Sequence, residues 1–199
     1  MKRLGFNIVL LGMITSGKET QANILKKKYA LKFVETGVYS RKLLKEKSRN
    51  GAWARRTTGK GKPLPTVLLQ KFLIREIKNK PSKKNLLFLG GRLKPEAQLI
   101  VRMMREQKER LLTFYITLPD KEVYKRSLAR RRGKMKAIYK VLDEKKIIAR
   151  RIKWHKDQVG KTVKYYQKLG ILKKIKGDQP IPKVTKDILK EIEKYRKGN

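Results

Sequence analysis

Cysteine is absent from the 199-residue sequence, histidine occurs once, and acidic residues are scarce. Without cysteine the chain has no disulfide, no thiolate metal site and no thiol nucleophile, which fits a reducing compartment. The lone His155 excludes a histidine cluster. No apolar run approaches the roughly 20 residues of a membrane-spanning helix, and the first residues lack a signal-peptide pattern. We therefore expect an intracellular protein of the cytoplasm or of an organellar matrix.

Basic residues are abundant, since 55 Lys and Arg stand against 16 Asp and Glu, which gives a formal charge of +39. So few acids cannot neutralise the surface, which must carry a strong positive field. Such a field attracts phosphates, and binding through many Lys and Arg contacts weakens steeply with salt. We expect nucleotides and RNA, or a ribosome, as partners. The composition indicates no membrane partner and no oligomer.

Short apolar runs alternate with helical patterns along the chain. Strands are predicted at Asn7–Leu11, Lys32–Val34, Asn85–Leu89, Leu112–Thr117 and Leu172–Ile175. Helices are predicted at Lys18–Tyr29, Val38–Lys47, Thr66–Lys78, Pro95–Lys108, Lys121–Arg131, Glu144–Leu169 and Val184–Tyr195. This order predicts an α/β fold in which a mostly parallel five-stranded sheet is flanked by helices. The length suits a single domain over residues 1–199.

The stretch at residues 48–62, SRNGAWARRTTGKGK, resembles a core segment least. A tryptophan among arginines can stack on a nucleic-acid base, although a tryptophan in a small lobe more often serves packing. A second basic stretch, RRRGKMK, covers residues 130–136. The candidate RNA-binding residues in and near these stretches are Arg49, Trp53, Arg55, Arg56, Lys60, Lys62, Arg131 and Arg132.

Residues 10–22, LLGMITSGKETQA, join the first predicted strand to the first predicted helix. The spacing of Gly12 and Gly17-Lys18 is typical of a loop whose backbone N–H groups wrap phosphates at a helix N-terminus. Lys18 would then reach the outer phosphates. The alternative is an ordinary strand-to-helix turn. The candidate nucleotide-binding residues are Gly12, Ser16, Gly17, Lys18, Glu19 and Thr20.

The run from Lys18 to Ala22 resembles the GKGTQA segment of the adenylate kinase family. Other stretches resemble that family in the same order along nearly the whole chain. They are Thr36-Gly37 with Arg41, GKPLP at residues 61–65, RLKPEA at 92–97, LPD at 118–120 with Arg126 and Arg130, Arg151, and Tyr165-Tyr166 with residues 170–181.

The resemblance implies a P-loop nucleoside monophosphate (NMP) kinase fold, with an NMP-binding helical lobe at residues 37–79 and a short lid at 130–143. It also implies phosphoryl transfer between ATP and AMP with Mg²⁺, a reaction that depends on neutralising charge on the migrating oxygens. The implied catalytic residues are Lys18, Arg92, Arg126, Arg130 and Arg151. The implied NMP-binding residues are Thr36, Gly37, Arg41, Arg92 and Glu96.

Several acids of the family pattern are missing. Val38 replaces the Asp that follows Thr-Gly, and FLGGR at residues 88–92 replaces Asp-Gly-(Phe/Tyr)-Pro-Arg. The Asp pair at the lid hinge is reduced to Leu142-Asp143, with Lys140 in place of its Arg, and Glu96 replaces the Gln that reads adenine. These positions serve Mg²⁺ or AMP in the family, so the sequence predicts weakened or lost activity. We assign no protein ligand to a metal.

The candidate phosphate loop is also bulkier than the family pattern, because Met13-Ile14-Thr15-Ser16 replaces a Pro/Gly/Ala-rich stretch. β-branched Ile14 is expected to resist both positive φ and close approach of a ligand. Glu19 brings a carboxylate near the phosphates, where like charges about 4 Å apart cost on the order of 4 kcal/mol. Glu19 must therefore point away when a nucleotide binds.

Three functions remain open from the sequence. The first is an adenylate-kinase-like phosphotransferase that acts on ATP and AMP. The second is a non-catalytic protein that uses the same fold to bind RNA, for example as a ribosomal or ribosome-associated component. The third is a P-loop kinase for another nucleotide or a small metabolite.

Overall fold

Five segments, four of them mostly apolar, form one parallel sheet in the order β2-β3-β1-β4-β5. The strands are β1 (Asn7–Gly12), β2 (Leu31–Glu35), β3 (Asn85–Leu89), β4 (Leu111–Thr117) and β5 (Leu172–Lys176). The computed structural model describes residues 1–57, 64–132 and 143–198. Its sheet confirms the predicted fold class and places β1, which leads into the candidate phosphate loop, at the centre.

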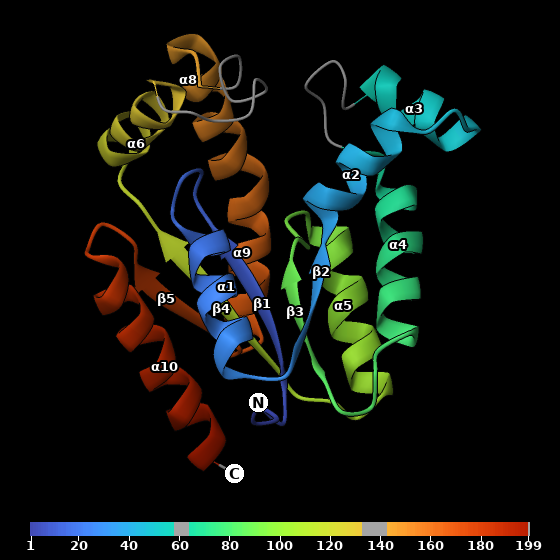
Figure 1. Ribbon diagram of the computed structural model, residues 1–199, viewed down its shortest axis with the longest axis vertical. Coiled ribbons are helices and arrows are strands. Elements are labelled where there is room, and N and C mark those ends of the chain that lie inside the picture. Colours follow the sequence, from blue (N-terminus) through green and yellow to red (C-terminus); the bar gives the residue numbers. More distant parts are fainter. Residues whose placement is uncertain (58–63, 133–142, 199) are drawn as a thin grey trace.

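Helices connect the strands and cover both faces of the sheet (Figure 1). The α-helices are α1 (Lys18–Lys28), α2 (Thr36–Lys45), α3 (Arg49–Thr57), α4 (Thr66–Lys78), α5 (Lys94–Glu106), α6 (Asp120–Arg132), α8 (Lys145–Trp154), α9 (Gly160–Lys168) and α10 (Ile181–Lys197), and a π-helical turn, η2 (His155–Val159), joins α8 to α9. No helix within the described ranges is long and apolar enough to span a membrane.

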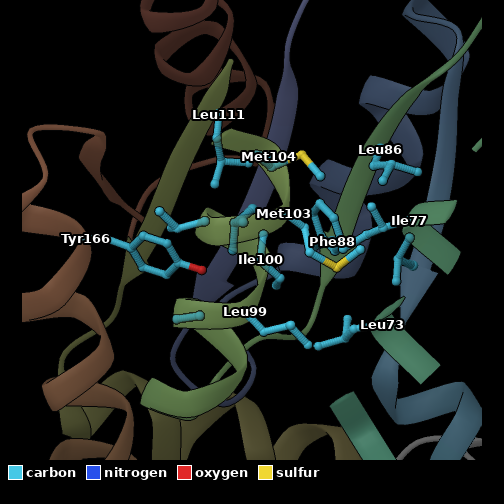
Figure 2. Close-up of a cluster of buried hydrophobic side chains, with 14 of the residues drawn as sticks. Leu73, Ile77, Leu86, Phe88, Leu99, Ile100, Met103, Met104, Leu111 and Tyr166 are labelled. Atoms are coloured by element: carbon cyan, nitrogen blue, oxygen red, sulfur yellow. The ribbon is translucent and has the colours of Figure 1, made fainter. Parts of the chain in front are cut away.

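Each face of the sheet carries its own hydrophobic core. On one face, β1, β4 and β5 pack against α1 and α10, with Phe114 and Ile188 fully buried. On the other face, β1 and β3 pack against α4, α5 and α9. Figure 2 shows this second core around Phe88, Ile100 and Tyr166. Continuous apolar strands such as NLLFL are therefore buried on both sides, as expected for a parallel sheet.

Helices α2, α3 and α4 share a third buried cluster, made by Leu43, Ala54, Leu64, Leu68 and Leu69. Helices α2 and α3 lie beyond the ends of β2 and β3, whereas α4 runs alongside the sheet next to α5 (Figure 1). The stretch at residues 48–62, which resembled a core segment least, therefore contains helix α3, in which Gly51 and Ala54 are buried. Small residues at this spacing let α3 approach α2 closely, since a Cβ on Gly51 would lie 2.1 Å from the carbonyl oxygen of Glu46. Because Arg and Asn residues surround Gly51, α3 has no apolar repeat of helical period by which the sequence would have predicted it.

Candidate active site

The loop after β1 turns through two left-handed residues, Thr15 with φ of 57° and Gly17 with φ of 82°. Ile14 is not in this conformation, which agrees with the expectation that a β-branched residue resists positive φ. Gly12 must remain small, because a Cβ there would lie 2.5 Å from Ser16 Oγ. The loop therefore adopts its tight turn despite its unusual residues.

The side chains of Met13 and Ile14 pack against residues outside the loop. Met13 is buried with Leu118, Val123 and Ile148, in a cluster between the loop and helices α6 and α8, and Ile14 packs against the same cluster. The larger side chains thus join the loop to the helices that carry Arg130 and Arg151, rather than filling the space that a phosphate would need.

The loop leaves hydrogen-bond donors without partners. Among the described residues, Ser16 Oγ is buried and has no hydrogen-bond partner. The first backbone N–H groups of any helix lack intrahelical acceptors. At the start of α1, after Gly17, no side-chain cap accepts from them either. Unpaired donors at the positive end of a helix dipole attract an anion. Glu19 and Thr20 on this first turn are exposed to solvent.

Lys18 is surrounded by positive charge. Its Nζ lies 3.4 Å from the carbonyl oxygen of Met13. Burial and the charge of Arg92 lower the pKa of Lys18 from 10.5 to about 8, and Arg151 and Arg130 act in the same direction while Glu19 opposes them. The charges of residues on α1, the β3–α5 loop, α6 and α8 therefore act together at Lys18, an arrangement that a group of phosphates would neutralise.

A single buried carboxylate organises two of these arginines. Asp143 is fully buried, and both its oxygens accept hydrogen bonds from Arg130, at 2.7 and 2.8 Å. Arg151 reaches the same carboxylate at 3.3 Å. The sequence identified Asp143 only as what remains of an Asp pair. It did not predict that Asp143 binds both arginines, because residues 130, 143 and 151 lie on different segments of the chain.

Arg126, the remaining predicted catalytic residue, has a different environment. Its Nε donates to Glu122, one turn earlier on α6, at 2.7 Å. It is not among the charges that shift the pKa of Lys18. Lys18 and the three arginines that lower its pKa are thus four of the five predicted catalytic residues, whereas Arg126 pairs along its own helix.

The predicted NMP-binding residues lie where β2 and β3 end. Thr36 is buried and its Oγ1 donates to the carbonyl of Leu89 at 3.5 Å. A Cβ on Gly90 would lie 2.5 Å from Thr36, so this close contact requires glycine at position 90. Arg41 is exposed one turn into α2, with one guanidinium nitrogen near Gly37. Arg92 is exposed at the start of the next connection, and its guanidinium lies 5.9 Å from the centre of the Trp154 ring.

Glu96, a predicted NMP-binding residue, is buried near the start of α5. Its side chain is 98% buried, as only 2% of its surface is exposed. Burial raises the pKa of Glu96, whereas Arg92 and hydrogen bonds from the backbone of Leu93 and Arg92 lower it. A glutamate three residues into a helix that bonds back to the preceding backbone stabilises the helix start. The structure thus gives Glu96 a role in shaping the turn that presents Arg92.

The residues at this site do not fit a magnesium ion held by protein carboxylates. Phe88, at the position of the missing strand-end Asp, is fully buried in the core, and Asp143 is engaged by two arginines. Across residues 1–57, 64–132 and 143–198 there is no group of three acids, histidines or cysteines suited to a metal. Mg²⁺ can be held by substrate phosphates and water.

His155 is a site residue that the sequence did not single out. It is buried in the π-helical turn, and its Nε2 lies 3.2 Å from the Tyr115 hydroxyl. Burial, with the charges of Lys18 and Arg92, lowers the pKa of His155 from 6.5 to about 3. The imidazole is therefore neutral near neutral pH, and its hydrogen-bond partner is the Tyr115 hydroxyl. A π turn inserts one residue per helix turn, which no hydrophobic pattern reveals.

The predicted RNA-binding residues do not gather in one place. Arg49, Arg56 and Trp53 are exposed on α3, Trp53 by 44%. Arg55 instead donates to the carbonyl oxygens of Leu44 and Glu46, and so stabilises the end of α2. Arg131 and Arg132 are exposed at the end of α6. Lys60, Lys62 and most of the segment predicted as a lid lie outside the described residues.

Comparisons with known proteins agree with this geometry. Residues 10–171 match the sequence model of the family described as adenylate kinase. The chain is 26% identical to an adenylate kinase of Methanothrix thermoacetophila over 215 residues, which cover 96% of this chain and all of that protein. It is 28% identical to an adenylate kinase of Azobacteroides pseudotrichonymphae over 189 residues, which cover 94% of this chain and 97% of that one.

Proposed function

The chain belongs to the adenylate kinase family, and on that basis we propose that it transfers the γ-phosphoryl group of ATP to a nucleoside monophosphate, with AMP giving two ADP. The observation that carries this proposal is the set of cations around the phosphate loop. Arg92, Arg130 and Arg151 lower the pKa of Lys18, and the buried carboxylate of Asp143 holds Arg130 and Arg151 together. Phosphoryl transfer needs positioning and neutralisation of charge, and these cations supply both.

In the proposed reaction, an oxygen of the NMP phosphate attacks the γ-phosphorus, and the bond from that phosphorus to the β–γ bridging oxygen breaks. Lys18 and the backbone N–H groups of the loop hold the β- and γ-phosphates. Arg130 and Arg151, oriented by Asp143, neutralise the transferring group. Arg41 and Arg92 hold the NMP phosphate. Mg²⁺ would supply further charge neutralisation when bound to the ATP phosphates.

We expect turnover to be slower than in a family member with the full set of acids. The chain places Phe88 and Val38 at two positions where the family has aspartate, so water around Mg²⁺ loses protein acceptors. Losing one oriented polar contact in a transition state typically costs about 10²- to 10³-fold in rate. The remaining cations nevertheless keep the phosphates in place.

A coupled assay of ADP formation from ATP and AMP tests this function. Lys18→Ala is expected to abolish turnover, whereas Lys26→Ala, which removes an exposed lysine from the far end of the same helix, is expected to leave it unchanged. Offering CMP, GMP and UMP in place of AMP identifies the acceptor. Turnover equal in wild type and Lys18→Ala with every acceptor would refute the proposal.

The exposed group of Arg49, Trp53 and Arg56 on α3 favours a second candidate, a non-catalytic RNA-binding or ribosome-associated role. Co-sedimentation with ribosomes of the native host tests it. Retention that falls steeply between about 50 and 200 mM salt and is lost in Trp53→Ala is the expected result. Absence from the ribosomal fraction at low salt would exclude this candidate.

A further inference from the structure

A groove runs along the free edge of the sheet, remote in the fold from the lobe formed by α2, α3 and α4. Its volume is about 550 Å³, and its lining includes Lys173, Lys174, Lys176 and Lys190 with Asp187 and Glu191. Its lining comes mostly from strand β5 and helix α10, which lie side by side at one edge of the molecule in Figure 1. β5 ends the strand order, so no strand of the described chain pairs with its outer edge.

The outer edge of β5 presents backbone donors to this groove. The backbone N–H of Thr113 on β4 donates to the carbonyl of Ile171, and the hydroxyl of Thr117 donates to that of Ile175. Backbone groups alternate sides along a strand, so those of Leu172 and Lys174 point outward. The groove therefore combines outward N–H groups with lysine side chains.

The two carboxylates in the groove are already engaged. Asp187 accepts a hydrogen bond from Gln179 at 2.6 Å. Glu191 pairs with Lys194 at 2.9 Å and, more loosely, with Lys173 at 3.9 Å. Lys174, Lys176 and Lys190 form no ion pair within the described part of the chain. The net charge that the groove offers to a partner is positive.

We propose that this groove binds the phosphodiester backbone of one nucleic-acid strand. Lysines on an edge strand oppose pairing with a further β-strand, which disfavours an added peptide strand as the occupant. Phosphates, in contrast, accept hydrogen bonds from lysine and from backbone N–H alike. The lining described for the groove contains no aromatic side chain, so the groove contacts the backbone without reading bases.

This proposal is independent of the kinase activity, because the groove uses none of the residues placed at the phosphate site. Lys176 is left unchanged in the test below, since the adjacent Gly177 packs against the phosphate loop, where a Cβ would lie 3.5 Å from the carbonyl oxygen of Ser16. ADP formation measured on the same proteins separates failure of this proposal from failure of the proposed function.

The test measures binding of fluorescent oligo(U) as a function of salt. The groove variant carries Lys173→Gln, Lys174→Gln and Lys190→Gln. We expect its binding to be about tenfold weaker and its log–log salt slope to fall by about 2, since each lost contact to a single strand removes roughly 0.7. Thermal unfolding of each variant checks that the fold is intact.

The matched control carries Lys78→Gln, Lys83→Gln and Lys84→Gln, three exposed lysines toward the opposite edge of the sheet. We expect it to bind as the wild type does. Equal weakening of both triple variants, or weakening only in Arg49→Gln/Arg56→Gln on α3, would overturn the proposal, as would no binding of oligo(U) by the wild type.

Two further probes test the chemical class of the occupant. Oligo(U) and oligo(dT) of equal length are expected to bind equally well, because the groove contacts phosphates rather than sugars or bases. Poly-glutamate is expected to compete poorly at equal charge. Displacement of oligo(U) from the groove by poly-glutamate at equal concentration would contradict the proposal in favour of an acidic peptide.

Discussion

Asp143 shows how one acid can organise several cations at the scale of the residue. Its buried carboxylate holds Arg130 through two hydrogen bonds and contacts Arg151. With an acid at this point, the guanidinium groups are oriented before phosphates arrive, and the repulsion among Lys18, Arg92, Arg130 and Arg151 is partly offset. The few acids that the chain retains therefore matter more individually than they would in a neutral protein.

Replacing Asp143 by Asn is expected to lower the free energy of unfolding by about 3 kcal/mol, because two arginines lose a buried partner. Urea unfolding monitored by circular dichroism measures the change. The control is Glu122→Gln, which removes the partly exposed partner of Arg126 and is expected to cost under about 1 kcal/mol. Equal effects of the two substitutions would contradict the role given to Asp143.

His155 makes stability depend on pH in a predictable direction. The pKa of His155 is about 3 in the folded protein and about 6.5 in the unfolded chain. As the pH falls, the unfolded state therefore binds the proton at a higher pH than the folded state does. Stability is therefore lost as pH falls below about 6.5, by roughly 2–3 kcal/mol at about pH 4.5 from this group alone.

Comparing the wild type with His155→Gln isolates that contribution, because glutamine does not titrate and keeps a hydrogen-bonding group near Tyr115. The two proteins are unfolded by urea at several pH values between neutral and about 4.5. We expect the wild type to lose more stability than the variant over this range. Parallel pH profiles would show that His155 is not the group responsible.

At the scale of the element, β3 and α2 meet through a contact that only glycine allows. Gly90→Ala would place a methyl group 2.5 Å from Thr36, which the buried threonine cannot easily avoid. We expect a loss of about 1–3 kcal/mol in stability, and a larger rise in KM for the nucleoside monophosphate than for ATP.

Gly160→Ala is the matched control, because a Cβ there meets no atom within 4 Å and the residue is helical. This change is expected to be neutral or to add about 0.5–1 kcal/mol of stability. Thermal unfolding and steady-state kinetics on both variants make the comparison. Equal KM values for the nucleoside monophosphate in wild type and Gly90→Ala would show that the position of Thr36 does not affect nucleotide binding.

The sequence predicted the sheet well, because apolar runs such as NIVLL and NLLFL satisfy burial on both faces and have few alternatives. Helix α3 was not predicted, because its helical pattern rests on Gly51 and Ala54 rather than on large apolar residues. The predicted helix at Glu144–Leu169 is present as a helical run, but its π turn depends on how His155 packs against Tyr115.

The sequence predicted only part of the candidate site. Whether a residue could be predicted depended on whether its position follows from a local motif or from contacts between distant segments. Lys18 follows a local loop motif, so its place is fixed by neighbours in the chain. Asp143 acquires its role only from contacts between segments, which no local pattern encodes. Met13 and Ile14 were judged by the bulk of their side chains and, for Ile14, by its backbone preference, whereas both side chains pack with residues of α6 and α8.

At the scale of the whole molecule, a charge of +39 on 199 residues makes self-repulsion a general cost of folding. Salt screens such repulsion, and phosphate ions also bind at cationic sites. We expect the midpoint of thermal unfolding to rise from about 10 to 150 mM sodium chloride, and to rise further in sodium phosphate of equal ionic strength. A midpoint that falls with either salt would contradict this account.

The central claim is that the cations gathered at the phosphate loop still perform phosphoryl transfer. The most direct test follows the label of ATP carrying ³²P in its γ-phosphate, incubated with AMP, Mg²⁺ and the protein, and separates the products by chromatography. With the wild type, label is expected to appear in ADP, and with Lys18→Ala it is not. Label that stays in ATP, or is released only as inorganic phosphate, would contradict the claim.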